Sequence, residues 1–189
     1  MPGVNISTAV RTGPVSTGNA PAATFFLVGE TERGTDSKAV KVESLAQYVT
    51  AFGGYESSKY TYQQVRTFFE EGGSVAYVAR VSASDATAAS IALVAEPSSA
   101  AGVTLTAVGK GMWGNDIYVA VTNSGSTFSA IVYFGGTTDN DVVWSSSGFA
   151  TLAEFISTVN NSAVLANYVT AALTSGASAS ALLSLSLIH

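Results

Sequence analysis

Few residues of this sequence have the types and spacing that enzyme chemistry requires. The only histidine is His189, the final residue, and cysteine is absent. Histidine-based acid–base catalysis, Ser-His-Asp triads, thiolate metal sites and disulfides are therefore not expected. Glu70 and Glu71 are neighbours in sequence, so on a helix their carboxylates point in different directions and do not act as a pair. We predict no catalytic residue, no cofactor and no metal site.

Two other patterns have residue types that suit ligand binding. Residues 109–114 match the G-x-G-x-x-G spacing of a dinucleotide-binding loop, but that loop needs a helix directly after the glycines. Here residues 116–119 predict a strand, so we interpret the glycines as a loop between strands. Asp139-Asn140-Asp141 offers oxygen ligands for a cation, but turn formation explains the triplet better. A hydrolase acting through Asp116 or Glu154 is the remaining enzyme hypothesis, and no acidic cluster supports it.

The composition suits a protein that packs against copies of itself, and it also suits a secreted or structural β-protein. Hydrophobic residues make up 47% of the 189 residues and charged residues only 11%, against about a quarter in ordinary globular domains. The net charge of −5 disfavours nucleic-acid binding through a basic face. The first residues lack the pattern of a signal peptide, and polar residues interrupt the uncharged stretch 155–188 too often for a membrane span. We expect a soluble protein that binds neither nucleic acid nor membrane.

The elements that would position any site start with a helix-turn-strand unit at residues 61–81. Thr61 and Gln64 predict a capping box at the helix start, and the glycine pair at 72–73 predicts its end. The strand that follows is apolar enough for the middle of a sheet. Arg80 is the one charge within it, so it should pair with a carboxylate or lie near the strand end.

The preceding segment completes an α/β layer. Residues 24–29 predict a short buried strand next to the one at 75–81, and residues 39–42 a second short strand. Ser44 with Gln47 predicts a capping box that opens an amphipathic helix ending at the glycines 53–54.

The first 22 residues predict an extended arm. They hold three of the four prolines, and one alternating set of residues is that of a strand: Val4, Ile6, Thr8 and Val10. Such an arm can add a strand to the sheet of a neighbouring subunit. A frayed or locally folded terminus is the alternative.

The second half predicts a β-rich domain. Residues 84–101 are rich in Ser and Ala and contain Pro97, which predicts a linker, with a short helix over 86–94 as an option. From residue 102 onward, alternating patterns predict hairpins, and Thr151 with Glu154 predicts a capped helix. Residues 164–173 fit a strand or a helix. The apolar residues 177–189 either pack on this domain or indicate that the native chain continues, and we favour continuation.

Several segments, in a shared order over some 160 residues, resemble contractile-tail sheath proteins of phages and related injection machines. They are Pro2-Gly3-Val4; Phe25-Phe26-Leu27-Val28-Gly29 followed by Glu32-Arg33-Gly34; the core motif with Phe68, Phe69, Gly72, Gly73, Tyr77 and Arg80; the loop AVGKGMWGN with Gly111, Trp113, Gly114 and Asn115; and Val159-Asn160-Asn161-Ser162.

The resemblance implies an α/β (α+β) fold: a mixed-sheet core domain with flanking helices, a β-rich inserted α+β domain and an extended N-terminal arm. It implies an arm at 1–22, part of the core domain at 23–83, a linker at 84–101 and an inserted outer domain at 102–189 that is incomplete at its C-terminal end.

The implied function is that of a sheath subunit, not an enzyme, in a virion tail assembled in the host bacterial cytoplasm. Copies would form rings and a helical tube around a tail tube, joined by strand exchange through Val4, Ile6, Thr8 and Val10. Contraction would then drive genome or effector delivery. Implied partners are the tail tube protein, through a domain not present here, and baseplate and tail terminator proteins. The alternatives are another tail or baseplate protein with a sheath-like core, or a secreted β-rich adhesin.

Overall fold

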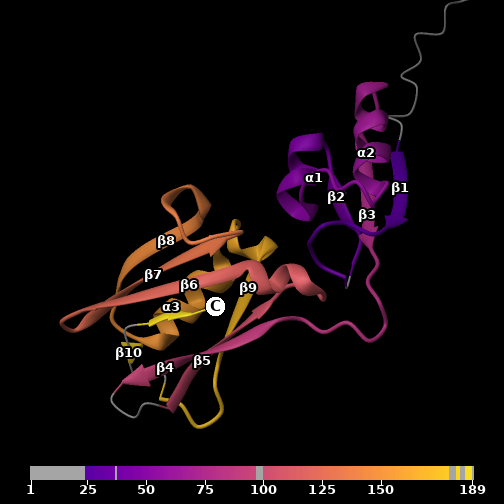
Figure 1. Cartoon of the computed structure of the whole chain (residues 1–189). Helices are drawn as coiled ribbons and strands as arrows, with labels where there is room; N and C mark the ends of the chain where they lie inside the picture. Colours follow the sequence, from indigo (N-terminus) through magenta and orange to yellow (C-terminus); the bar gives the residue numbers. More distant parts are fainter. Residues whose placement is uncertain (1–23, 37, 97–99, 179–181, 184–185, 189) are drawn as a thin grey trace, which may run out of the picture.

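The chain forms two lobes, each with its own hydrophobic core (Figure 1). The computed structural model describes residues 24–36, 38–96, 100–178, 182–183 and 186–188. We call residues 24–80 the small lobe, and the described residues from 90 onward the large lobe. Within these described residues, three sheets and three α-helices give a mixed α+β architecture, which confirms the predicted fold class.

The small lobe is a three-stranded sheet with both of its helices on one face. Its elements are β1 (Thr24–Gly29), β2 (Val40–Val42), α1 (Leu45–Phe52), α2 (Thr61–Glu70) and β3 (Val75–Arg80). The strand order is β1-β3-β2, with β1 parallel and β2 antiparallel to β3. The predicted central position of β3 and its pairing with β1 are thus confirmed. The prediction that β1 is buried is wrong in part, because β1 is an edge strand and Phe26 and Val28 are exposed.

Capping residues mark the start of α1 and the end of α2. Ser44 accepts a hydrogen bond from the Gln47 N–H at 3.2 Å, as predicted. Gly72, at φ +89°, ends α2, and the Gly73 N–H reaches the Phe68 carbonyl at 2.9 Å, which is the Schellman pattern.

The capping box predicted at Thr61 is wrong. Tyr60 occupies the N-cap position of α2, and its side chain makes no capping hydrogen bond. Thr61 is buried inside the first turn, and a Cβ at Gly29 would overlap its hydroxyl oxygen. The Thr61 side chain therefore packs α2 against β1, which prevents it from capping the helix.

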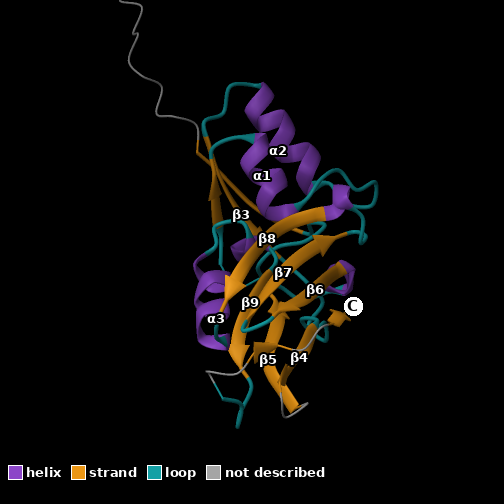
Figure 2. Ribbon diagram, turned by 90° about the vertical axis from the view of Figure 1, so that its left-hand side faces the viewer, coloured by secondary structure: helices purple, strands orange, loops and turns teal. Residues whose placement is uncertain are grey.

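The large lobe consists of two four-stranded sheets and one α-helix (Figure 2). Its elements are β4 (Ser90–Glu96), β5 (Ala100–Ala107), the 3₁₀ helix η1 (Met112–Asp116), β6 (Ile117–Ser124), β7 (Thr127–Phe134), η2 (Asp139–Asp141), β8 (Val142–Phe149), α3 (Leu152–Asn161), η3 (Leu165–Asn167), β9 (Val169–Leu173), β10 (Leu182–Leu183) and β11 (Ser186–Ile188). The sheet orders are β10-β4-β5-β9 and β11-β6-β7-β8.

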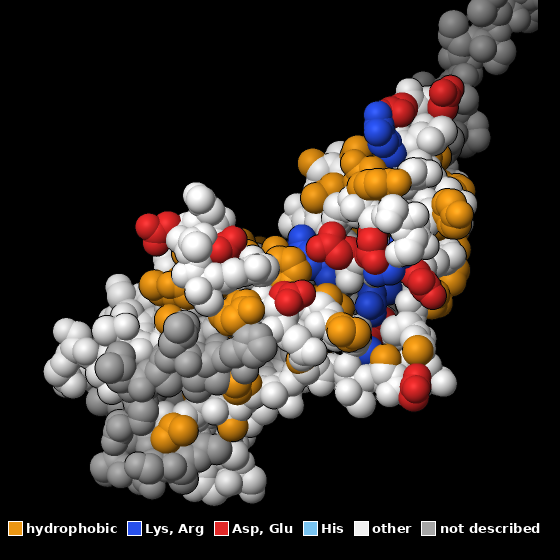
Figure 3. Space-filling view, viewed as in Figure 1, with side chains coloured by type: hydrophobic (Ala, Val, Ile, Leu, Met, Phe, Trp, Pro, Cys, Tyr) orange, Lys and Arg blue, Asp and Glu red, His pale blue; other side chains and the backbone are white. Residues whose placement is uncertain are grey.

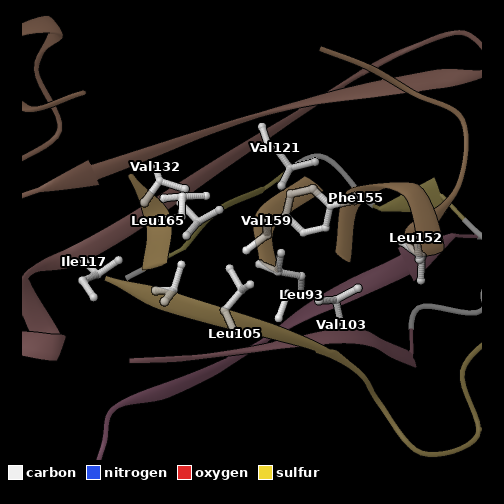
Figure 4. Close-up of a cluster of buried hydrophobic side chains, with 14 of the residues drawn as sticks. Leu93, Val103, Leu105, Ile117, Val121, Val132, Leu152, Phe155, Val159 and Leu165 are labelled. Carbon is white, nitrogen blue, oxygen red and sulfur yellow. The ribbon is translucent and has the colours of Figure 1, made fainter. Parts of the chain in front are cut away.

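The core of the large lobe lies between these sheets and α3. Figure 4 shows Phe155 and Val159 of α3 among side chains from both sheets, including Leu93 and Val121. Thr151 caps α3 by accepting a hydrogen bond from the Glu154 N–H at 3.2 Å, as predicted.

Two segments differ from their sequence interpretation. The helix considered over 86–94 is wrong, because β4 begins at Ser90, inside the segment assigned as linker. Leu93 is fully buried in the core, and pairing of β4 with β5 outweighs the local preference of alanine for helix. Residues 164–173 combine both options, with a 3₁₀ turn at η3 before strand β9.

The C-terminal stretch adds a strand to each sheet of the large lobe. β10 pairs with β4 and β11 pairs with β6, both antiparallel. Of the two interpretations given for residues 177–189, packing on this domain is therefore observed for these two strands.

Candidate functional site

The predicted core motif divides between the interior and the surface of the small lobe. Phe68 stacks on Phe25 at 5.1 Å between ring centroids and meets Phe69 edge-on at 5.2 Å. A Cβ at Gly73 would overlap the Phe68 ring. The aromatic residues and Gly73 therefore have a packing role at the contact between α2 and β1, whereas Gly72 has no neighbour there and serves to end the helix.

The opposite face of the small sheet presents apolar side chains to solvent. Phe26 is 62% exposed and Val28 57%, both on β1, and Tyr77 on β3 is 36% exposed. Figure 3 shows hydrophobic side chains on the surface of the small lobe. The arm residues that would contact a neighbour lie outside the described residues: Val4, Ile6, Thr8 and Val10.

Arg80 is the member of the core motif that reaches the large lobe. It is the last residue of β3, it is 8% exposed, and its Nη1 forms an ion pair with Asp36 Oδ1. Both options predicted for this arginine, a carboxylate partner and a place at the strand end, are therefore confirmed. The other oxygen of Asp36 accepts a hydrogen bond from the Lys110 N–H at 2.6 Å. Asp36 thus links β3 to the loop between β5 and β6.

The predicted loop motif lies on the other side of this contact. Gly111 has φ +111°, and a Cβ there would lie 3.4 Å from Arg80 Nη2. The Trp113 indole N–H donates to the Lys110 carbonyl at 3.1 Å. Gly114 is packed between Ala89 and Ala107, where a Cβ would crowd both side chains. The interpretation of these glycines as a loop between two strands is confirmed, and the loop includes the short helix η1.

Asn115 lines a small cavity between the sheets of the large lobe. Its volume is about 130 Å³, and its lining is mostly apolar, with Ile91, Leu105 and Val119 among the residues. None of the described residues that line it is titratable. The cavity offers no group for acid–base chemistry.

Arg33 also joins the small lobe to the large lobe. Its guanidinium carbon lies 4.6 Å from the ring centroid of Tyr168 and 5.3 Å from that of Phe134, and both rings belong to the large lobe. These rings are themselves 5.4 Å apart, and Trp113 meets Phe134 at 6.4 Å. The loop motif, the aromatic pair and Arg33 therefore form one continuous junction with the Asp36–Arg80 pair.

Sequence reasoning did not single out most of this junction. Arg33 entered only as part of a resemblance motif, and Asp36, Phe134 and Tyr168 were not identified. The one local signal was the charged loop directly after an uncharged strand, which holds Arg33 and Asp36.

Glu154, considered for catalysis, and Asp141, considered as a cation ligand, both have structural roles. Glu154 Oε2 accepts the Ala150 N–H at 3.0 Å at the start of α3. Asp141 accepts the Thr138 hydroxyl and N–H at 2.6 and 2.9 Å, and these bonds lower the pKa of Asp141. This is turn chemistry, as expected for the triplet at 139–141. Within the described residues, no three acidic, histidine or cysteine side chains are grouped as metal ligands would be.

None of the helices in the described part of the chain is long and apolar enough to cross a membrane.

Charge is unevenly distributed, because no lysine or arginine follows Lys110 in the sequence. In Figure 3 the visible charged side chains gather mainly over the small lobe.

The fold has a counterpart among solved structures. No family model matches the sequence, and no curated protein matches it. The crystal structure of a sheath tail protein from Listeria innocua is similar, with a TM-score of 0.56 over 88% of this chain and 20% sequence identity. This chain spans 33% of the length of that protein. The resemblance drawn from the sequence motifs is therefore confirmed at the level of structure, and the chain has the fold of a sheath tail protein.

Proposed function

We propose that this chain is a structural subunit of a contractile tail sheath, and not an enzyme. The observation that carries the proposal is the similarity of fold to a sheath tail protein over 88% of the chain. The ordered motifs of the sequence support the same assignment independently. This chain spans 33% of the length of that protein, so every function of a complete sheath subunit is proposed for this chain and not shown by the comparison.

In this proposal the subunits associate with one another in rings around a tail tube, within a virion tail. Contraction of the assembly would drive delivery of a genome or an effector. Contacts with the tube, the baseplate and the tail terminator protein are inferred from the resemblance alone.

We further propose the domain assignment: an arm at 1–22, part of a core domain at 23–83 and an inserted outer domain after it. The two separate hydrophobic cores support this division. Because β4 begins at Ser90, we shorten the linker from 84–101 to residues 84–89.

Two features support self-association through the small lobe. Phe26 and Val28 are exposed on an edge strand that has no charged residue, although exposed edges normally carry charges or prolines that block pairing. The predicted arm is also uncharged over residues 4–10 and alternates as a strand does. Added strands bind through backbone hydrogen bonds and use alternate side chains for specificity.

The arm is tested by comparing two triple variants with the same charge change. Val4→Asp, Ile6→Asp and Val10→Asp place charges on the apolar side of the predicted strand, and Asn5→Asp, Ser7→Asp and Ala9→Asp place them on the other side. Assembly is followed by sedimentation and electron microscopy, and folding by circular dichroism. We expect the first variant, like deletion of residues 1–22, to stay folded and fail to assemble, with the second retaining assembly. Normal assembly of the deletion variant would refute the arm.

A tail or baseplate protein with a sheath-like core is the second candidate, since a shared fold supports it equally. Copy number separates the two. Quantitative mass spectrometry of purified particles should find this chain among the most abundant proteins if it forms a sheath, and present in few copies if it belongs to a baseplate.

A further inference from the structure

The two lobes have separate hydrophobic cores and are joined through a small junction of charged and aromatic residues. No buried residue is shared between their cores. The covalent connection is the segment 81–89, which contains no helix or strand. Such a connection does not by itself fix the angle between two bodies, so their orientation depends on the contacts between them.

The loop that carries Arg33 is held firmly on the small lobe. The Arg33 N–H donates to the Phe52 carbonyl at 3.1 Å, and the Thr31 hydroxyl donates to the Arg33 carbonyl at 2.7 Å. Glu32 accepts the Gly54 N–H at 2.7 Å. The loop is therefore fastened to the C-terminal end of α1 before its side chain reaches the large lobe.

The Arg33 guanidinium then contacts both lobes at once. Its Nη2 donates to the Val49 carbonyl of α1 at 3.0 Å, while its plane lies near the rings of Phe134 and Tyr168. Arg33 is 7% exposed, and its Nε and Nη1 have no hydrogen-bond partner among the described residues. The contacts with the aromatic rings thus offset part of the free-energy cost of removing the guanidinium from water. A cation over an aromatic face is attracted more strongly when it is desolvated.

The neighbouring contacts restrict the same motion. A Cβ at Gly109 in the large lobe would overlap the carbonyl oxygen of Gly34, the residue after Arg33. Asp36 binds Arg80 of the small lobe and the Lys110 N–H of the large lobe. The backbones therefore meet directly next to the Asp36 contact, because the same Cβ at Gly109 would also lie 3.3 Å from Asp36 Oδ2.

We propose that Arg33 is an interlobe latch, which holds the large lobe in one orientation on the small lobe. With the latch in place, a force on either lobe is transmitted through Arg33 and its aromatic partners as well as through the connection 81–89. Without it, the lobes stay folded and swing about that connection. The inference concerns one subunit and does not depend on the sheath assignment.

The absence of cysteine allows the separation of the lobes to be measured between two introduced cysteines. Spin labels can be attached at two exposed positions, Ser57→Cys in the small lobe and Ser126→Cys in the large lobe. Pulsed electron paramagnetic resonance then gives the distribution of distances between the two labels. We expect one narrow distribution in the labelled parent chain. Arg33→Ala should broaden and shift this distribution, with the circular dichroism of the folded chain retained.

Two further variants separate a latch from a general effect of charge. Arg33→Lys keeps the positive charge but loses the planar group, so it should also broaden the distribution. Arg66→Ala removes an arginine from an exposed pair with Glu70 and should leave the distribution unchanged.

Tyr168→Leu tests the latch from the large lobe, with Arg33 intact, and covers the case in which Arg33→Ala does not fold. It should broaden the distribution in the same way. A narrow distribution at the parent distance, in folded Arg33→Ala or in folded Tyr168→Leu, would overturn the proposal.

Discussion

Replacing Asp36 by alanine should destabilise the chain far more than removal of a surface carboxylate. The side chains of Arg80 and Asp36 are 6% and 17% exposed. After the substitution the guanidinium of Arg80 stays buried without a counter-charge, and its Nε already has no hydrogen-bond partner among the described residues. The Lys110 N–H also loses its acceptor.

The size of the loss follows from these contacts. Removing one partner of a buried ion pair costs about 3–5 kcal/mol, and leaving a buried N–H unpaired costs about 1–3 kcal/mol. These two costs do not add in full, because the residual exposure of the site lets water solvate the groups that are left unpaired. We therefore expect the free energy of unfolding to fall by about 3–4 kcal/mol.

Urea denaturation followed by circular dichroism measures this loss. With a slope of about 2 kcal/mol per molar urea, the midpoint should fall by roughly 1.5–2 M. Glu43→Ala is the matched control, because its ion pair with Lys41 is about half exposed, and its midpoint should not change measurably. Asp36→Ala combined with Arg80→Met should regain most of the loss, since apolar residues replace a buried pair at little cost.

A loss below about 1 kcal/mol, the range of surface pairs, would refute this reasoning. It would mean that Arg80 and Asp36 are solvated in solution and that the polar junction between the lobes is open to water.

Two further predictions concern the cores. Phe155 is fully buried and meets Phe149 at 5.4 Å between ring centroids, so Phe155→Ala should cost about 3–5 kcal/mol in urea denaturation followed by circular dichroism. Phe26→Ala, at a 62% exposed residue, should cost little, and equal effects of the two substitutions would contradict the assigned core. Burial, with smaller contributions from Glu32 and Tyr62, raises the pKa of Tyr48 well above its ordinary value of 10.0, so the folded chain holds this proton at pH values where the unfolded chain releases it. The contribution of Tyr48 to the free energy of unfolding is therefore fully present below about pH 10 and should decline as the pH rises further. Urea denaturation across this pH range should show the decline in the parent chain. A decline of the same size in Tyr48→Phe would rule out this group as its source.

Local signals in the sequence predicted much of the fold. The caps at Ser44 and Thr151 and the glycine end of α2 are short-range interactions, so the residues that make them are close together in sequence. The alternation of Ile117, Val119 and Val121 likewise identifies a strand with one buried face.

The errors arose where tertiary contacts outweigh local preference. Thr61 has the residue type of a helix cap, but packing against Gly29 occupies its side chain. The alanines near β4 favour a helix, but pairing with β5 makes this segment a strand.

The candidate site was the least predictable part. Arg33, Phe134 and Tyr168 lie far apart in the sequence, and nothing local to any of them indicates that they meet. Arg80 was the exception, because a single charge within an apolar strand requires a partner wherever it lies.

The pairing of β10 with β4 and of β11 with β6 has a consequence for synthesis on the ribosome. The small lobe is built from residues 24–80 and has all its strands available early in translation. Both sheets of the large lobe receive their outermost described strand from residues 182–188, so they stay incomplete until these residues emerge. Until then β4 and β6 are open edges, which are prone to pair with other chains, and contacts between segments so distant in sequence form slowly. The large lobe therefore needs protection from aggregation until residues 182–188 have been synthesised.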